Sequence, residues 1–361
     1  MQATAMRVLG AAAAAVDLAV RSTALARTGG KRNADLLRHE VRVALMHRLK
    51  DRYEKLGAYQ SYFRDPRPLH PEQDVRLERR DGVRVIDVHW PSNYRTFLPE
   101  VQEQYERIQE NHTATARLVV HPEPRPLVIL IHGYLGGVHA MERRIWPMGF
   151  LERLGLDVAL FVLPFHGRRM DRGLGGLPPF PGADPRITNE GFRQAMADFR
   201  DLFGWLSERG HPHIGVMGMS LGGYSTALAA TLEDRLAFSV PMIPLASIAD
   251  VAKLNGHLGS DPDDVEAQWR GLSAAHRMVS PLHRKAGIDS SRILIIASER
   301  DQITPIVHAR KLAAHFRCRM ETMPGGHLVQ LGRNDKFRSF GRFLREIGVV
   351  GAESSAGGAV R

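Results

Sequence analysis

Cysteine is almost absent from this sequence of 361 residues, and so are long apolar runs. The single cysteine, Cys318, cannot form an intramolecular disulfide, and its apolar surroundings predict a small buried side chain. No uninterrupted apolar run is long enough to span a bilayer, so we predict no transmembrane helix. Residues 8–16 are rich in alanine but are followed directly by Asp17 and Arg21, which favours an ordinary N-terminal helix over a cleaved signal peptide. We therefore predict a cytoplasmic protein.

Runs of like charge are absent as well, although the formal net charge is +10. The basic residues are scattered and no nucleic-acid-binding motif is present, so we predict no nucleic-acid partner. One helix has a regular apolar stripe, because every fourth residue from Leu37 to Tyr53 is apolar while arginines occupy the other faces. We expect this stripe to pack on the rest of the chain, and peripheral contact of the basic helix with an anionic membrane is the alternative. Nothing in the sequence indicates an oligomeric state.

Short apolar strands and amphipathic helices alternate from residue 127 onward. The expected strands lie near 127–131, 157–163, 213–219, 237–243, 292–298 and 318–323. The expected helices lie near 139–154, 189–208, 221–233, 305–316 and 335–347. The run 127–131 is apolar without interruption, as in a central strand buried on both faces. This alternation predicts an α/β fold with a mostly parallel central sheet flanked by helices.

The remaining segments suggest how the chain is divided. Residues 1–114 are predicted to form an N-terminal helical extension with leading strands, and residues 115–348 the main α/β domain. Residues 248–291 interrupt the alternation and predict a small cap or lid. Residues 349–361 are rich in glycine, alanine and serine, which is typical of a disordered tail.

The segment Gly218-Met219-Ser220-Leu221-Gly222 lies where a predicted strand meets a predicted helix. Gly-x-Ser-x-Gly at such a junction is typical of a nucleophile elbow, in which a sharp turn exposes the serine hydroxyl. Small neighbours are needed there because strand and helix approach closely. A plain glycine turn with Ser220 as a helix N-cap would use the same residues, and the other segments below favour the nucleophile.

A second glycine-rich segment, His132 to Gly137, follows the expected central strand. Such a loop can turn a backbone N–H towards the space above Ser220. We therefore expect the backbone N–H groups of Leu221 and Tyr134 to form an oxyanion hole.

A base and an acid are expected at later strand ends. His327 follows the last predicted strand on a glycine turn. Three carboxylates compete for the acid: Asp250, Glu299 and Asp301. Asp250 has an ordinary role near a helix start, and Glu299 has the longer side chain, so we predict Asp301. Asp301 is also followed by Pro305, which we expect at the first position of the next helix.

With these motifs the chain resembles the α/β-hydrolase superfamily, over roughly residues 115–348. The resemblance implies that Ser220 is the nucleophile, Asp301 the acid and His327 the base, in the chain order typical of this architecture. It implies neither an organic cofactor nor a metal. The pair His211 and His213 has no third ligand nearby and is interpreted as a surface turn.

The predicted activity is cleavage of a carboxylic ester through an acyl-enzyme on Ser220. The substrate is expected to be a small-molecule or lipid ester. The N-terminal helices and the Arg143-Arg144 pair also resemble hydrolase-domain proteins suggested to act on lipid acyl groups. Two alternatives stay open: an acyltransferase with the same acyl-enzyme, and a non-catalytic hydrolase-like binding protein.

Overall fold

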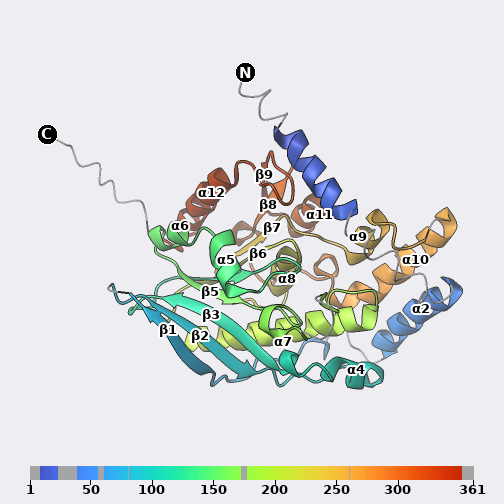
Figure 1. The fold of residues 1–361 in the computed structure, drawn as a ribbon, viewed down its shortest axis with the longest axis horizontal. Helices are drawn as coiled ribbons and strands as arrows, with labels where there is room; N and C mark the ends of the chain where they lie inside the picture. The colour runs from blue at the N-terminus through green and yellow to red at the C-terminus, as the bar shows by residue number, and fades with distance from the viewer. Residues whose placement is uncertain are drawn as a thin grey trace.

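The computed structural model describes residues 9–22, 39–55, 61–79, 81–171, 177–259 and 261–351. Within them a nine-stranded sheet has the order β1-β2-β3-β5-β4-β6-β7-β8-β9, with helices on both faces (Figure 1). The strands are β1 (Glu72–Glu78), β2 (Arg84–Pro91), β3 (Thr113–Val120), β4 (Leu127–Ile131), β5 (Asp157–Phe161), β6 (Ile214–Met219), β7 (Ser239–Met242), β8 (Leu294–Ser298) and β9 (Arg319–Met323).

The strand directions confirm the predicted α/β fold with a mostly parallel sheet. From β5 to β9 all neighbouring strands pair in parallel, whereas β1, β2 and β3 form an antiparallel edge. The central strands β4 and β6 are buried along their whole length, because helices cover both faces. Strand β1 was not predicted, since every side chain in it is exposed and no apolar face marks it.

The helices follow the predicted alternation with local corrections. They are α2 (His39–Lys55), α4 (Gln102–Glu106), α5 (His139–Ile145), α6 (Met148–Arg153), α7 (Pro185–Glu208), α8 (Leu221–Ala229), α9 (Ile248–Leu254), α10 (Pro262–Ala275), α11 (Val307–Phe316) and α12 (Arg333–Glu346). The single helix expected over 139–154 is two helices, because Pro147 lacks the N–H that would continue the first.

Two smaller expectations were wrong. Pro305 does not begin α11, which starts at Val307 with Ile306 as its N-cap. Cys318 is half-buried rather than fully buried, and this partial burial raises the pKa of its thiol to about 11. The residue therefore lies beside the core as a protonated thiol.

The apolar stripe of α2 is covered largely by the chain itself. Leu49 and Tyr53 of the stripe are buried, as is the neighbouring Met46, whereas Val41 is 40% exposed. Helix α10 packs against α2, and Gly271 of α10 lies close to the Met46 side chain. These contacts are those expected for docking, while Leu37 lies outside the described residues and membrane contact stays a prediction. Among the described helices, none combines the length and the apolarity needed to cross a membrane.

The predicted cap segment, residues 248–291, is helical. Helices α9 and α10 occupy it between β7 and β8, followed by short 3-10 turns at His276–Val279 and Pro281–His283. Because α10 also packs on α2, the N-terminal extension and the cap segment share an interface. The predicted domain boundaries and the role of the segment as a lid stay predictions, and residues 352–361 of the predicted tail lie outside the described residues.

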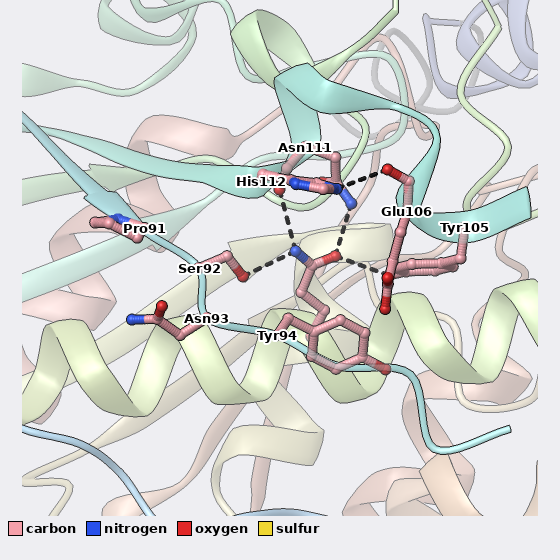
Figure 2. A pocket seen from close by; sticks show the side chains of 9 residues that line it. Pro91, Ser92, Asn93, Tyr94, Tyr105, Glu106, Asn111 and His112 are labelled. Carbon is pink, nitrogen blue, oxygen red and sulfur yellow. Dashed lines mark hydrogen bonds between the residues drawn. The ribbon is translucent and has the colours of Figure 1, made fainter. Parts of the chain in front are cut away.

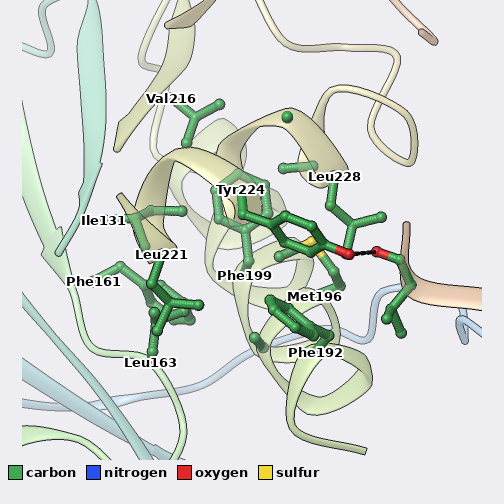
Figure 3. Packing of buried hydrophobic residues seen from close by; sticks show 14 of the residues in the cluster. Ile131, Phe161, Leu163, Phe192, Met196, Phe199, Val216, Leu221, Tyr224 and Leu228 are labelled. Carbon is green, nitrogen blue, oxygen red and sulfur yellow. Dashed lines mark hydrogen bonds between the residues drawn. The ribbon is translucent and has the colours of Figure 1, made fainter. Parts of the chain in front are cut away.

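Helix α8 is fixed by an extensive apolar cluster. Figure 3 shows Leu221, Tyr224 and Leu228 of α8 packed among side chains of α7 and of the neighbouring strands. All three are buried, and the Tyr224 hydroxyl donates to the Val279 carbonyl at 3.0 Å. The residue preceding this helix, Ser220, is therefore held by a rigid element.

Candidate active site

Ser220 lies on a strained turn between β6 and α8. Its φ is 57° and its ψ is −113°, a conformation that costs a non-glycine residue roughly 1–3 kcal/mol. The turn is possible because Gly218 and Gly222 lack side chains: a Cβ at Gly222 would strike the carbonyls of Ile131 and His132. The Ser220 N–H donates to the Met242 carbonyl of β7 at 3.0 Å. These features are those of the expected nucleophile elbow.

The glycine-rich loop after β4 lies directly beside the serine. A Cβ added at Gly133 would lie 3.6 Å from the Ser220 Cβ. Tyr134 follows Gly133, and its side chain is 42% exposed. Leu221 is the first residue of α8, so its N–H has no carbonyl partner one turn earlier in the helix. Leu221 thus directly follows Ser220, and Tyr134 directly follows the glycine that lies beside it, while their role in an oxyanion hole stays a prediction.

Asp301 and His327 are in direct contact. Asp301 Oδ2 lies 2.7 Å from His327 Nδ1, and both side chains are buried. Asp301 Oδ1 accepts from the backbone N–H groups of Ile303 (2.8 Å) and Thr304 (2.7 Å), which fixes the carboxylate in its turn.

The two competing carboxylates have other partners. Asp250 accepts from the Trp269 indole at 2.7 Å and from the Lys311 ammonium at 2.6 Å. Burial raises the pKa of Asp250, but these two hydrogen bonds and the positive charge of Lys311 lower it, and the net shift is downward. Glu299 accepts from the Thr322 hydroxyl at 2.8 Å. Of the three candidates, Asp301 is the one that contacts His327.

Thr304 is a site residue that the sequence analysis missed. Its hydroxyl oxygen lies 3.0 Å from each of three atoms: Asp301 Oδ2, His327 Nδ1 and the Ile243 carbonyl oxygen. Since a hydroxyl has one proton, it can donate to one of the two oxygens while accepting from the imidazole N–H. Thr304 therefore ties Asp301 and His327 to Ile243, the residue that follows β7. Thr304 follows Asp301 by three residues, a spacing common in polar turns, so the sequence could have predicted a polar turn here.

The loop that carries His327 also contacts β6, the strand that precedes Ser220. The Gln330 amide donates to the His327 carbonyl at 3.0 Å and lies 4.0 Å from the Met219 sulfur. In the described residues no hydrogen bond joins the Ser220 hydroxyl to the imidazole. His327 Nδ1 is bonded to Asp301, so Nε2 is the ring nitrogen that remains to accept a proton. Hydrogen bonds between catalytic groups often tighten only when substrate binds.

Two further histidines pack together at the glycine-rich loop after β4: His132, its first residue, and His166. His132 Nδ1 contacts the Gly133 carbonyl at 2.7 Å, and Nε2 accepts from the Leu163 N–H at 3.0 Å, so the ring is neutral. Burial lowers the pKa of His132 to about 4. Burial lowers the pKa of His166, and the positive charge that His132 gains on protonation lowers it further, to about 3. Both rings therefore support the loop as neutral, buried groups.

These two histidines predict a loss of stability in acid. Their folded pKa values lie below the unfolded value of about 6.5, so unfolding takes up protons as the pH falls. Each histidine should lower the free energy of unfolding by about 2 kcal/mol between pH 7 and pH 5. Urea unfolding at these pH values measures the slope. His166→Phe should unfold with a shallower pH dependence, and an unchanged dependence would rule out this origin.

A cavity of about 230 Å³ is lined by residues other than Ser220, Asp301 and His327 (Figure 2). It is lined by Pro91, Ser92, Asn93, Tyr94, Tyr105, Glu106, Asn111, His112 and Gln194. Its polar groups bond to one another, as Gln194 accepts from Tyr105 (2.8 Å) and Asn111 (2.7 Å) and donates to Ser92 (2.9 Å). Drug-sized ligands need roughly 300 Å³ or more. We interpret this network as structural.

The buried network continues to the loop after β5. Asn111 accepts from the Phe165 N–H at 3.0 Å, and its carbonyl accepts from Arg169 at 3.1 Å. Arg169 is fully buried and pairs with Asp198 at 2.8 Å. The network thus fixes the segment that carries His166. Within the described part of the chain, no three His, Cys, Asp or Glu side chains gather as metal ligands would.

The parallel sheet, the elbow and the strand-end residues define an α/β-hydrolase fold. The chain has the fold of the α/β-hydrolase superfamily. A family model described as alpha/beta hydrolase domain containing 18 matches residues 192–256, which include the elbow.

The chain is similar to curated proteins in sequence and to solved structures in fold. An uncharacterized protein of Mycobacterium tuberculosis, found in two strains, is 32% identical over 279 residues, which is 74% of this chain. This chain spans 65% of the length of those curated relatives. Among solved structures, acetyl xylan esterases from Paenibacillus and Thermoanaerobacterium species are each 17% identical with a TM-score of 0.53. The alignments cover 81% and 84% of this chain and 93% of each esterase, and they show the fold.

Proposed function

We propose that the protein is a serine hydrolase that cleaves carboxylic esters through an acyl-enzyme on Ser220. The observation that carries the proposal is the Asp301–His327 contact of 2.7 Å, at the same edge of the sheet as a serine on a strained elbow. A structural serine has no need of this conformation, and a structural histidine has no need of a buried carboxylate on Nδ1.

In the proposed reaction, His327 Nε2 takes the proton of Ser220 as the hydroxyl attacks the ester carbonyl. The oxyanion is stabilised by the N–H groups of Leu221 and Tyr134. Asp301 keeps the proton on His327 Nδ1 and stabilises the imidazolium. His327 then protonates the leaving alcohol, and water, activated by the same imidazole, releases the acid from the acyl-enzyme.

A graded panel of p-nitrophenyl esters tests the reaction class. We expect turnover with at least one acyl length and a burst of nitrophenol equal to one per active site where deacylation is slow. A protein that hydrolyses none of the esters and retains no acyl group would contradict the proposal and favour a hydrolase-like binding protein.

The acyltransferase alternative shares the acyl-enzyme and differs only in the acceptor. Water and added alcohols should therefore be made to compete. We expect the free acid to remain the main product when glycerol or a short alcohol is added at moderate concentration. Product analysis by mass spectrometry measures the partition, and a predominance of the new ester would assign acyl transfer instead.

A further inference from the structure

Asp17 lies far from the α/β domain in sequence but against its site residues in space. It belongs to the helical residues 9–22, which appear in blue beside β9 and α11 in Figure 1. Its side chain is fully buried. Asp17 Oδ2 accepts from the His327 backbone N–H at 2.6 Å, and Oδ1 accepts from the Leu328 N–H at 3.0 Å. The carboxylate therefore holds the backbone of the predicted base itself.

The same carboxylate reaches the loop of the predicted acid. Asp17 Oδ2 also accepts from the Gln302 N–H at 3.3 Å, and Gln302 directly follows Asp301. One turn further along the helix, Arg21 donates to the Gln302 carbonyl at 2.8 Å. The helix thus bridges the two loops whose side chains must meet for the Asp301–His327 contact.

Two glycines permit this close approach. A Cβ at Gly326 would lie 2.6 Å from Asp17 Oδ2 and 3.0 Å from the Ala13 carbonyl oxygen. A Cβ at Gly10 would lie 2.8 Å from the Pro324 carbonyl oxygen. The helix backbone therefore rests on the turn that presents His327.

A buried carboxylate is costly unless its oxygens are bonded, and here three backbone N–H groups supply those bonds. Apolar side chains would dock a helix at lower cost. A buried carboxylate that accepts hydrogen bonds from the loops of Asp301 and His327 instead fixes the position of one loop relative to the other. Acyl transfer requires its catalytic groups to be placed to within about 0.5 Å.

We propose that Asp17 is a positioning residue for acyl transfer, which makes the N-terminal helix part of the active site. The inference rests on the proposed function. Asp17 touches neither the substrate nor the reacting atoms, and acts through the backbone of His327 and of the residue after Asp301.

The test is the full-length Asp17→Asn variant. One carboxylate oxygen becomes an NH₂ group, which cannot accept a hydrogen bond, so at least one N–H loses its partner. We expect kcat per active site to fall roughly 10- to 100-fold with KM unchanged, as for a displacement of catalytic groups by about 1 Å. Active sites are counted by titration with a fluorophosphonate. Asp51→Asn, the same change at an exposed position of α2, is the matched control and should keep the wild-type kcat.

Two readouts separate positioning from mere stability. Peptides covering residues 325–331 should exchange their amide hydrogens faster in Asp17→Asn. In the Asp301→Asn background, where the imidazole already carries its proton on the wrong nitrogen, adding Asp17→Asn should lower kcat by less than threefold, because coupled residues are not additive. A wild-type kcat per titrated site, or a full additional loss in the double variant, would overturn the proposal.

Failure of the proposed function can be distinguished from failure of the inference about Asp17. Wild-type protein that neither reacts with the fluorophosphonate nor hydrolyses any ester would refute the esterase and the inference with it. If Asp17→Asn does not fold, Arg21→Ala breaks the other bond to the Asp301 loop. It should lower kcat in the same direction by a smaller factor with KM unchanged, and a wild-type kcat there would refute the proposal.

Discussion

Ser220→Ala is expected to lower ester turnover by roughly 10⁴-fold or more while the protein stays folded. The variant removes the oxygen that forms the acyl-enzyme and leaves the apolar packing of α8 untouched. Alanine and serine have similar difficulty at φ 57°, so the elbow strain should change little. Steady-state turnover and thermal unfolding, measured on the same preparation, check the two halves of this expectation.

Ser207→Ala is the matched control. Ser207 lies in α7, and its hydroxyl donates to the Phe203 carbonyl one turn earlier at 2.9 Å, an ordinary helical contact. It should retain wild-type turnover. Near-normal hydrolysis by pure Ser220→Ala protein would remove Ser220 from the reaction and leave the elbow as a structural turn.

Asp301→Asn is expected to lower turnover by roughly 10⁴-fold through the wrong histidine tautomer. The two N–H groups of Ile303 and Thr304 require an oxygen at the Oδ1 position. The amide nitrogen must therefore face His327 Nδ1 and donate to it. The ring then carries its proton on Nε2, where it can no longer accept the proton of Ser220.

Asp250→Asn is the control for this variant. Asp250 accepts from Trp269 and Lys311, away from the imidazole, so the change should leave turnover within a few-fold of wild type. A loss of activity in Asp250→Asn beside near-normal Asp301→Asn would move the acid to Asp250, in the first turn of α9.

Local sequence signals carried most of the fold and the candidate site. Gly218 and Gly222 flank a serine at a strand–helix junction, where the close approach of backbone leaves no room for a side chain. Because the turn requires glycine at both positions, the Gly-x-Ser-x-Gly pattern predicts it. The uninterrupted apolar run of β4 likewise reports burial on both faces. The exposed edge strand β1 has no such pattern, because its pairing with β2 rather than side-chain burial keeps it extended.

Long-range polar contacts could not be predicted in the same way. Asp17 and His327 are separated by 310 positions, and nothing near Asp17 marks it as the partner of a distant backbone N–H. The sequence indicated that the helix with the stripe from Leu37 to Tyr53 would pack on the domain, but not that an earlier helix would hold the turn of the predicted base. Thr304 is the intermediate case, since its spacing from Asp301 suggests a polar turn but not its contact with the imidazole.

Labelling of the wild-type protein with a fluorophosphonate tests the central claim most directly. The reagent phosphonylates serines that an adjacent base activates, and peptide mass spectrometry identifies the modified residue. The account predicts one label per chain, on Ser220, that is lost in Ser220→Ala and greatly slowed in Asp301→Asn. Absence of labelling, or a label on a different serine that persists in Ser220→Ala, would contradict it.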